Sequence, residues 1–60
     1  MKSIDGQTKT GKARSLSWDV RDGRIYLWIH PPDGHDTSGW EILVDPRDLR
    51  QLVVAIIETL

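Results

Sequence analysis

The most constraining feature of the chain is its C-terminal segment, Asp45 to Leu60, which has the pattern of an amphipathic helix. Asp45 suits the N-cap, because its carboxylate can accept hydrogen bonds from the free amides of the first turn, and Pro46 suits the first helical position, where no donor is needed. A helix of this length is marginal alone in water. It therefore requires an apolar surface to lie on. Its own apolar residues recur at the i, i+3, i+4 spacing of one helical face: Leu49, Leu52, Val53, Ile56, Ile57 and Leu60.

Residues 14–30 can supply such a surface as a β-hairpin. Polar and apolar residues alternate from Arg14 to Val20, and the Asp22-Gly23 dipeptide is a strong signal for a two-residue turn. That turn fixes the register of the two strands. Arg21 then faces Arg24, and the pairing continues outward from the turn, one residue at a time on each strand. With this register the apolar residues of both strands fall on one side of the sheet: Leu16, Trp18, Val20, Ile25, Leu27 and Ile29.

The rest of the chain completes a meander. Residues 31–39 consist almost wholly of turn residues and predict a loop, and Trp40 to Val44 predicts a further strand. We therefore predict an α+β fold, an antiparallel β-meander of three to four strands followed by one C-terminal amphipathic helix. We expect the apolar stripe of this helix to cover a sheet face that includes Leu16, Trp18, Ile25, Leu27 and Ile42.

Composition limits the class of protein. Sixty residues make one domain at most, and a chain without cysteine has neither disulfides nor thiolate metal ligands. No apolar run approaches the roughly 20 residues of a membrane span, and the polar N-terminus is unlike a signal peptide. We therefore expect an intracellular, cytoplasmic protein. Residues 1–13 predict a flexible basic arm, in which Ser3-Ile4-Asp5 could add a short edge strand, and residues 14–60 predict the folded domain.

Charge is distributed unevenly along the chain. Residues 1–14 carry four basic residues against one acid (+3), whereas residues 15–60 carry four arginines against eight acids (−4). A basic arm on a mildly acidic body is one way of holding a polyanion, although an ordinary solvated tail has the same composition.

One helix can cover only one face of the sheet, so the opposite face is the candidate binding surface. The predicted register places Arg21, Arg24, Tyr26, Trp28 and His30 there. Aromatic rings stack on bases and arginines neutralise phosphates, so this face suits single-stranded nucleic acid. Aromatic residues and arginine are also enriched in protein interfaces, and Asp19 and Glu41 lie in the same patch. A protein partner is therefore the alternative.

Residues suited to catalysis or metal binding are few. His30 and His35 lie near Asp33 and Asp36, but their spacing matches none of the usual metal motifs. No arrangement of a nucleophile with a base is apparent, and there is no glycine motif for phosphate binding. We expect no enzymatic activity, no cofactor and no metal.

Two segments together resemble a known family. Residues 14–29, with the tight charged hairpin, and residues 39–52, with Gly39, a short strand and a helix that opens at Asp45-Pro46, are similar to the positive cofactor four family of transcriptional coactivators. The resemblance implies a homodimer of four-stranded sheets, with the helices meeting at the interface, and binding of single-stranded DNA through the sheet. It departs from the family before the last strand, where the family has a lysine- and glycine-rich segment and this chain has His35 to Gly39 without lysine.

These observations lead to one functional hypothesis and one alternative. The leading hypothesis is a small, non-enzymatic, homodimeric protein that binds single-stranded DNA or RNA, for example a transcription regulator, located in the cytoplasm, nucleoid or nucleus. The alternative is a protein-interaction module, such as a small regulator or phage-type inhibitor, that uses the same face. The predicted nucleic-acid-binding residues are Lys9, Lys12, Arg14, Arg21, Arg24, Tyr26 and Trp28, and the predicted dimer-interface residues are Leu49, Val53, Ile56, Ile57 and Leu60.

Overall fold

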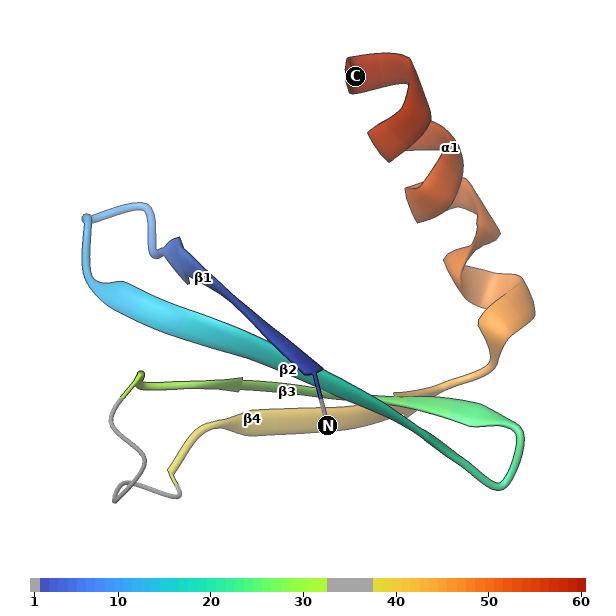
Figure 1. Cartoon of the computed structure of the whole chain (residues 1–60), viewed down its shortest axis with the longest axis horizontal. Coiled ribbons are helices and arrows are strands. Elements are labelled where there is room, and N and C mark those ends of the chain that lie inside the picture. The colour runs from blue at the N-terminus through green and yellow to red at the C-terminus, as the bar shows by residue number, and fades with distance from the viewer. Residues whose placement is uncertain (1, 33–37) are drawn as a thin grey trace.

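The computed structural model describes residues 2–32 and 38–60, which form one sheet and one C-terminal helical segment (Figure 1). The strands pair in the order β1-β2-β3-β4, each antiparallel to its neighbour, so β1 and β4 are the edges. The predicted fold class, an α+β meander, is confirmed. Asp33, His35 and Asp36, considered above as metal ligands, lie outside the described residues. The elements are β1 (Lys2–Gln7), β2 (Ala13–Arg21), β3 (Arg24–His30), β4 (Trp40–Val44), η1 (Pro46–Leu49) and α1 (Arg50–Thr59).

The central hairpin has the predicted register. Arg21 pairs with Arg24, Trp18 with Leu27 and Leu16 with Ile29. Asp22 and Gly23 both have positive φ, 52° and 75°. Two positive φ values in sequence define the type I′ turn, whose twist matches that of the strands it joins. The turn and the apolar alternation therefore specify the same pairing.

The N-terminal segment belongs to the sheet. The whole of β1 pairs with β2, with Ile4 opposite Leu16, so the edge strand that was expected at residues 3–5 extends over six residues. The connecting turn is closed by the N–H of Thr8, which donates to the carbonyl of Lys12, and the N–H of Gly11, which donates to the carbonyl of Thr8 (both 2.9 Å).

The pairing of β4 with β3 completes two sheet faces of different character. Opposite residues of antiparallel strands share a face, and alternate residues along a strand point to opposite faces. The apolar face carries Ile4, Leu16, Trp18, Val20, Ile25, Leu27, Ile29, Trp40, Ile42 and Val44. The polar face carries Asp5, Ser15, Ser17, Asp19, Arg21, Arg24, Tyr26, Trp28, His30, Glu41 and Leu43.

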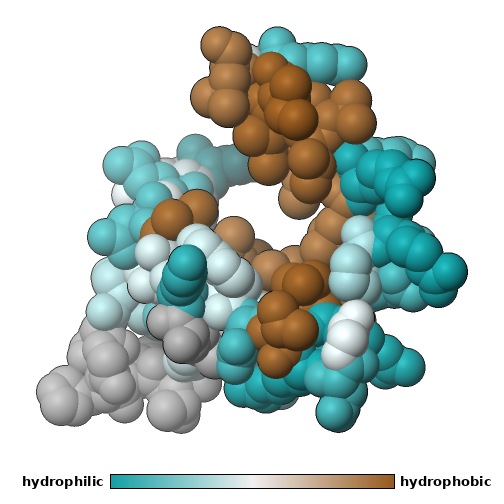
Figure 2. All heavy atoms as spheres, turned by 45° about the vertical axis from the view of Figure 1, so that its right-hand side comes forward, coloured by the Kyte–Doolittle hydropathy of each residue, from teal (hydrophilic) through white to brown (hydrophobic). Residues whose placement is uncertain are grey.

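The helix does not lie on the sheet, so the expectation that its stripe covers the apolar face of its own chain is wrong. The close contacts of α1 are with η1, and Figure 1 shows α1 rising away from the strands. Val53 and Ile56 are each about half exposed, and Leu60 is 98% exposed. Figure 2 shows apolar helix residues and apolar sheet residues on opposite sides of an open hollow. Among the described residues, no helix has the length and apolar character that crossing a membrane requires.

The corner between β4 and η1 directs the helix away from the sheet. Asp45 is extended (φ −65°, ψ 129°), and its carboxylate accepts hydrogen bonds from the N–H of Arg47 (2.9 Å) and from Arg47 Nη2 (2.8 Å). Pro46 restricts φ at the next position. The side-chain and backbone hydrogen bonds of Arg47 lower the pKa of Asp45 below its ordinary value. The predicted N-cap is thus confirmed, and it begins a 3-10 turn that leads into α1.

Candidate nucleic-acid interface

The polar face is built around the ring of Tyr26 in β3. The guanidinium carbon of Arg21 lies 3.9 Å from the centre of this ring, a cation–π contact between β2 and β3. The Tyr26 hydroxyl donates a hydrogen bond to Oε2 of Glu41 in β4. This bond raises the pKa of Tyr26 above its ordinary value, and burial and the charge of Glu41 act in the same direction. With only 9% of its surface exposed, Tyr26 connects three strands and is covered by Arg21.

A second aromatic unit lies further along β3. The rings of Trp28 and His30 stack with their centres 3.8 Å apart and their planes 22° apart. His30 Nδ1 lies 2.7 Å from the carbonyl oxygen of Pro31, which can only accept, so Nδ1 carries a proton. In the neutral ring, Nε2 then accepts from the hydroxyl of Ser17 (2.7 Å). These contacts hold the half-buried Trp28 indole in one orientation, as a stacking surface requires.

Gly39 supports the Trp28 ring from the end of the loop. Its φ is +147°, and a Cβ built on it would lie 2.3 Å from the carbonyl oxygen of Ile29 and 2.9 Å from Trp28 Nε1. The backbone at Gly39 therefore approaches β3 more closely than any residue with a side chain could. This accounts physically for the one residue that the resemblance retains clearly in this region.

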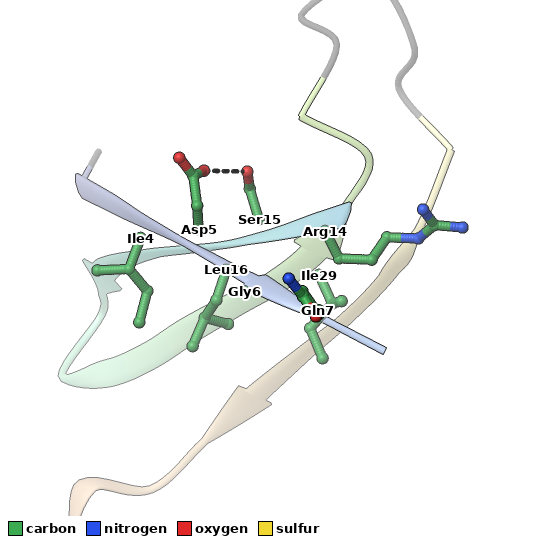
Figure 3. Close-up of a pocket in the computed structure, with 8 residues that line it drawn as sticks. All are labelled: Ile4, Asp5, Gly6, Gln7, Arg14, Ser15, Leu16 and Ile29. Carbon is green, nitrogen blue, oxygen red and sulfur yellow. Dashed lines mark hydrogen bonds between the residues drawn. The ribbon is translucent and has the colours of Figure 1, made fainter. Parts of the chain in front are cut away.

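The polar face also connects β1 to the rest of the sheet. The hydroxyl of Ser15 donates to Oδ1 of Asp5 (2.8 Å), and Figure 3 shows both side chains on one side of the strands, with Ile4 and Leu16 on the other. Ser15 and Ser17 are only 5% and 4% exposed. The small β2 residues are thus covered by longer neighbours on this face.

The predicted phosphate-binding cations fall into two groups. Lys9 and Lys12 lie in the β1–β2 turn. Arg14 lies close by at the start of β2, where its Nη1 donates to the carbonyl of Ala13 (2.6 Å), and alternation along β2 assigns Arg14 to the apolar face with Leu16. Arg21 and Arg24 pair with each other at the opposite end of the sheet. Arg14 and Arg21 are seven residues apart on one strand, or about 23 Å at 3.3 Å per residue. The aromatic units lie between the two groups.

One exposed ring was not among the predicted site residues. Trp40 is 83% exposed, and it lines a shallow depression together with Arg14, His30 and Gly39 at the end of the sheet that carries Lys12. Alternation assigns Trp40 to the apolar face, and the register agrees. The signal that could have identified it is its position as the first residue of β4, directly after the predicted loop.

Acidic groups reduce the positive potential of the polar face. Asp5 accepts from Ser15 and Glu41 accepts from Tyr26. Oδ2 of Asp19 lies 3.9 Å from Nε of Arg21, a distant and exposed ion pair that contributes little. The three carboxylates Asp5, Asp19 and Glu41 outnumber the two arginines of this face, Arg21 and Arg24, so attraction for phosphate would depend on those arginines and on the lysines of the β1–β2 turn.

The described parts of the chain give no support for a metal centre, since no three His, Cys, Asp or Glu residues gather within them. The polar face with its flanking cations is thus the candidate site. Comparison with protein-family models, with curated proteins and with solved structures gives no significant match to this chain.

Proposed function

We propose that this protein binds single-stranded nucleic acid, DNA or RNA, across the polar face of its sheet. The observation that supports this most is the arrangement of Trp28, fixed by its stack on His30, between the cations of the β1–β2 turn and those of the β2–β3 hairpin. A strand crossing the face would stack a base on the indole and place phosphates near both ends. A regulator of transcription that holds an unpaired strand, in the cytoplasm, nucleoid or nucleus, is the form of this activity that we favour.

An oligonucleotide titration at several salt concentrations tests the proposal. Single strands release counterions with a slope of log affinity against log salt of about −0.7 per phosphate contact. If Lys9, Lys12, Arg14, Arg21 and Arg24 all engage, we expect a slope of about −3.5, a loss of about 100-fold in affinity for a fourfold rise in salt. If only Lys9, Lys12 and Arg14 engage, the slope is about −2. If only Arg21 and Arg24 engage, it is about −1.4. No binding at low salt would reject the function.

Two matched substitutions locate the strand. Arg24→Gln and Arg50→Gln remove the same charge from exposed positions, one at the hairpin and one in α1. We expect Arg24→Gln to make the slope shallower by about 0.7, and Arg50→Gln to leave it unchanged. Trp28→Ala should weaken binding by about 5- to 150-fold, as loss of one stacked base predicts, while Trp28→Phe should retain most of the affinity.

The alternative, a protein-interaction module, is favoured by one specific observation. Asp5, Asp19 and Glu41 lie on the same face and would repel a phosphate backbone. A protein partner with complementary cations and apolar groups would instead be attracted. This function predicts association that tolerates salt and no change of tryptophan fluorescence with oligonucleotide.

A further inference from the structure

We propose that β4 is a docking edge, at which an extended segment of a protein partner adds to the sheet as a further antiparallel strand. The segment alternates apolar residues with first a carboxylate and then a cation. This inference concerns the edge of the sheet, and it does not depend on nucleic-acid binding across the polar face.

The outer side of β4 is open. Within the described part of the chain β4 pairs with β3 alone, so alternate backbone N–H and C=O groups of β4 point away from the sheet. Among the same residues, no backbone hydrogen bond beyond the sheet ladder reaches residues 40–44. The close contacts of α1 are with η1, and four of the five β4 residues are exposed. The helix therefore leaves this edge accessible.

The length and composition of β4 suit a strand that accepts a neighbour. Its five residues rise about 17 Å, the length of an ordinary sheet strand. Trp40, Ile42 and Val44 are aromatic or β-branched, which are residue types favoured in sheets, and the strand contains no proline. Recognition by strand addition uses such an edge, because backbone hydrogen bonds supply affinity and alternate side chains supply specificity.

The side chains of β4 specify which residues the added strand carries. Opposite residues of paired strands have Cβ atoms about 4.5–5.5 Å apart, so each β4 residue contacts one residue of the added strand. On the apolar face, Trp40, Ile42 and Val44 select apolar residues. On the polar face, Glu41 and Leu43 leave two positions of the added strand at which charge decides.

The two positions on the polar face favour opposite charges. Glu41 is exposed, and besides the one hydrogen bond that its Oε2 accepts within the sheet, its carboxylate has lone pairs for a cation. Leu43 lines a shallow depression together with Arg21, Asp22 and Arg24, in which two guanidinium groups outnumber one carboxylate. A cation opposite Glu41 and a carboxylate opposite Leu43 are therefore favoured.

The direction of the added strand sets the order of these charges. All neighbouring strands of this sheet are antiparallel, and antiparallel pairs are slightly more stable than parallel ones. An antiparallel strand meets Leu43 before Glu41, so the minimal match is Val-Glu-Val-Lys-Val, with its central valine opposite Ile42. A second copy of β4 is the weaker match, because β4 contains no cation to lie opposite Glu41.

Capped synthetic peptides, titrated into the whole chain, test the proposal. Val-Glu-Val-Lys-Val should bind about fivefold more tightly than its isomer Val-Lys-Val-Glu-Val, which brings like charges together at both positions. Amide hydrogen exchange followed by NMR should show that the outward N–H groups of β4 become protected when the peptide is present. Tighter binding of the isomer, or no protection in β4, would overturn the proposal.

Methylation of the peptide backbone separates strand addition from side-chain contact. Alternate residues of an added strand direct their N–H groups toward β4, and the others direct them toward solvent. One peptide is methylated on the amides of Glu and Lys, and a second on the amides of the last two valines. One of them should keep the affinity of the parent peptide, and the other should lose about 30-fold, as the loss of two hydrogen bonds predicts. Equal affinities would refute strand addition.

Two matched variants test the charge recognition and the choice of partner. Glu41→Gln should reduce the preference between the two isomers from about fivefold to about twofold. Glu58→Gln, the same change in α1, should leave the preference intact. A full preference in Glu41→Gln would contradict the role of that carboxylate. Protection of β4 that rises with protein concentration in the absence of peptide would assign the edge to a second copy and overturn the proposed partner.

Discussion

Substitution of Gly39 by alanine should destabilise the fold more than the same change at any other glycine among the residues that the structure describes. The Cβ would lie 2.3 Å from the carbonyl oxygen of Ile29, and that oxygen belongs to the backbone of β3, which cannot move aside as a flexible side chain can. The φ of +147° adds backbone strain for any residue other than glycine. Together we expect a loss of about 3 kcal/mol in the free energy of unfolding.

Alanine substitutions at two other glycines measure the backbone strain separately from the steric clash. Gly11 has a φ of +88° but open space around its Cβ position, so alanine there should cost the backbone term alone, about 1 kcal/mol. Gly6 lies in β1 with nothing within 4 Å and without a positive φ. Alanine at Gly6 should be neutral, or stabilising by about 0.5 kcal/mol, because it restricts the unfolded chain.

Urea unfolding followed by circular dichroism, at one fixed protein concentration, measures the series. With a slope of about 1 kcal/mol per molar urea for a small chain, the midpoint should fall by about 3 M for Gly39→Ala, by about 1 M for Gly11→Ala and not at all for Gly6→Ala. Equal midpoints for the Gly39 and Gly6 variants would refute the steric argument.

Two further predictions concern titratable groups. Because Tyr26 is the single tyrosine of the chain, tyrosinate absorbance should titrate above the ordinary pKa of the residue, and Glu41→Gln should return the pKa toward that value. Because the pKa is raised, the stabilisation from the Tyr26–Glu41 hydrogen bond is complete below the ordinary tyrosine pKa and is lost as pH rises through the higher value. A titration at the ordinary tyrosine pKa would contradict the hydrogen bond. The pKa of Asp45 is lowered instead, so its contribution is present above the ordinary aspartate pKa and is lost as pH falls through the lower value. Asp45→Ala should reduce the melting temperature at neutral pH, and the difference in melting temperature between the variant and the unaltered protein should become smaller at low pH. An equal loss of melting temperature at both pH values would argue against the Arg47 contact.

Local patterns predict the strands well, because each depends on residues close together in sequence. The Asp22-Gly23 turn determines the hairpin register, and the apolar alternation agrees with it. Asp45-Pro46 marks the helical start for the same reason. The polar placement of Tyr26 and Trp28 follows directly from that register.

The sequence does not reveal which surface covers the helix stripe and which covers the apolar face of the sheet. Periodicity shows that the helix stripe and the sheet face each need a partner, and the expectation that they cover each other failed because the Asp45 corner points the helix elsewhere. The Tyr26–Glu41 hydrogen bond also could not be predicted from the sequence. It joins residues on a diagonal between β3 and β4, and their register depends on a loop whose conformation composition does not specify.

The two edges of the sheet differ in how well they resist pairing with a foreign strand. β1 presents Lys2 and Asp5, and charged residues on an edge discourage further strands from adding to it. β4, with the sequence Trp-Glu-Ile-Leu-Val, has one charge, no proline, and four of its five residues exposed. Sheet growth into fibres would therefore start at β4, and Leu43→Lys would protect that edge without altering the apolar face.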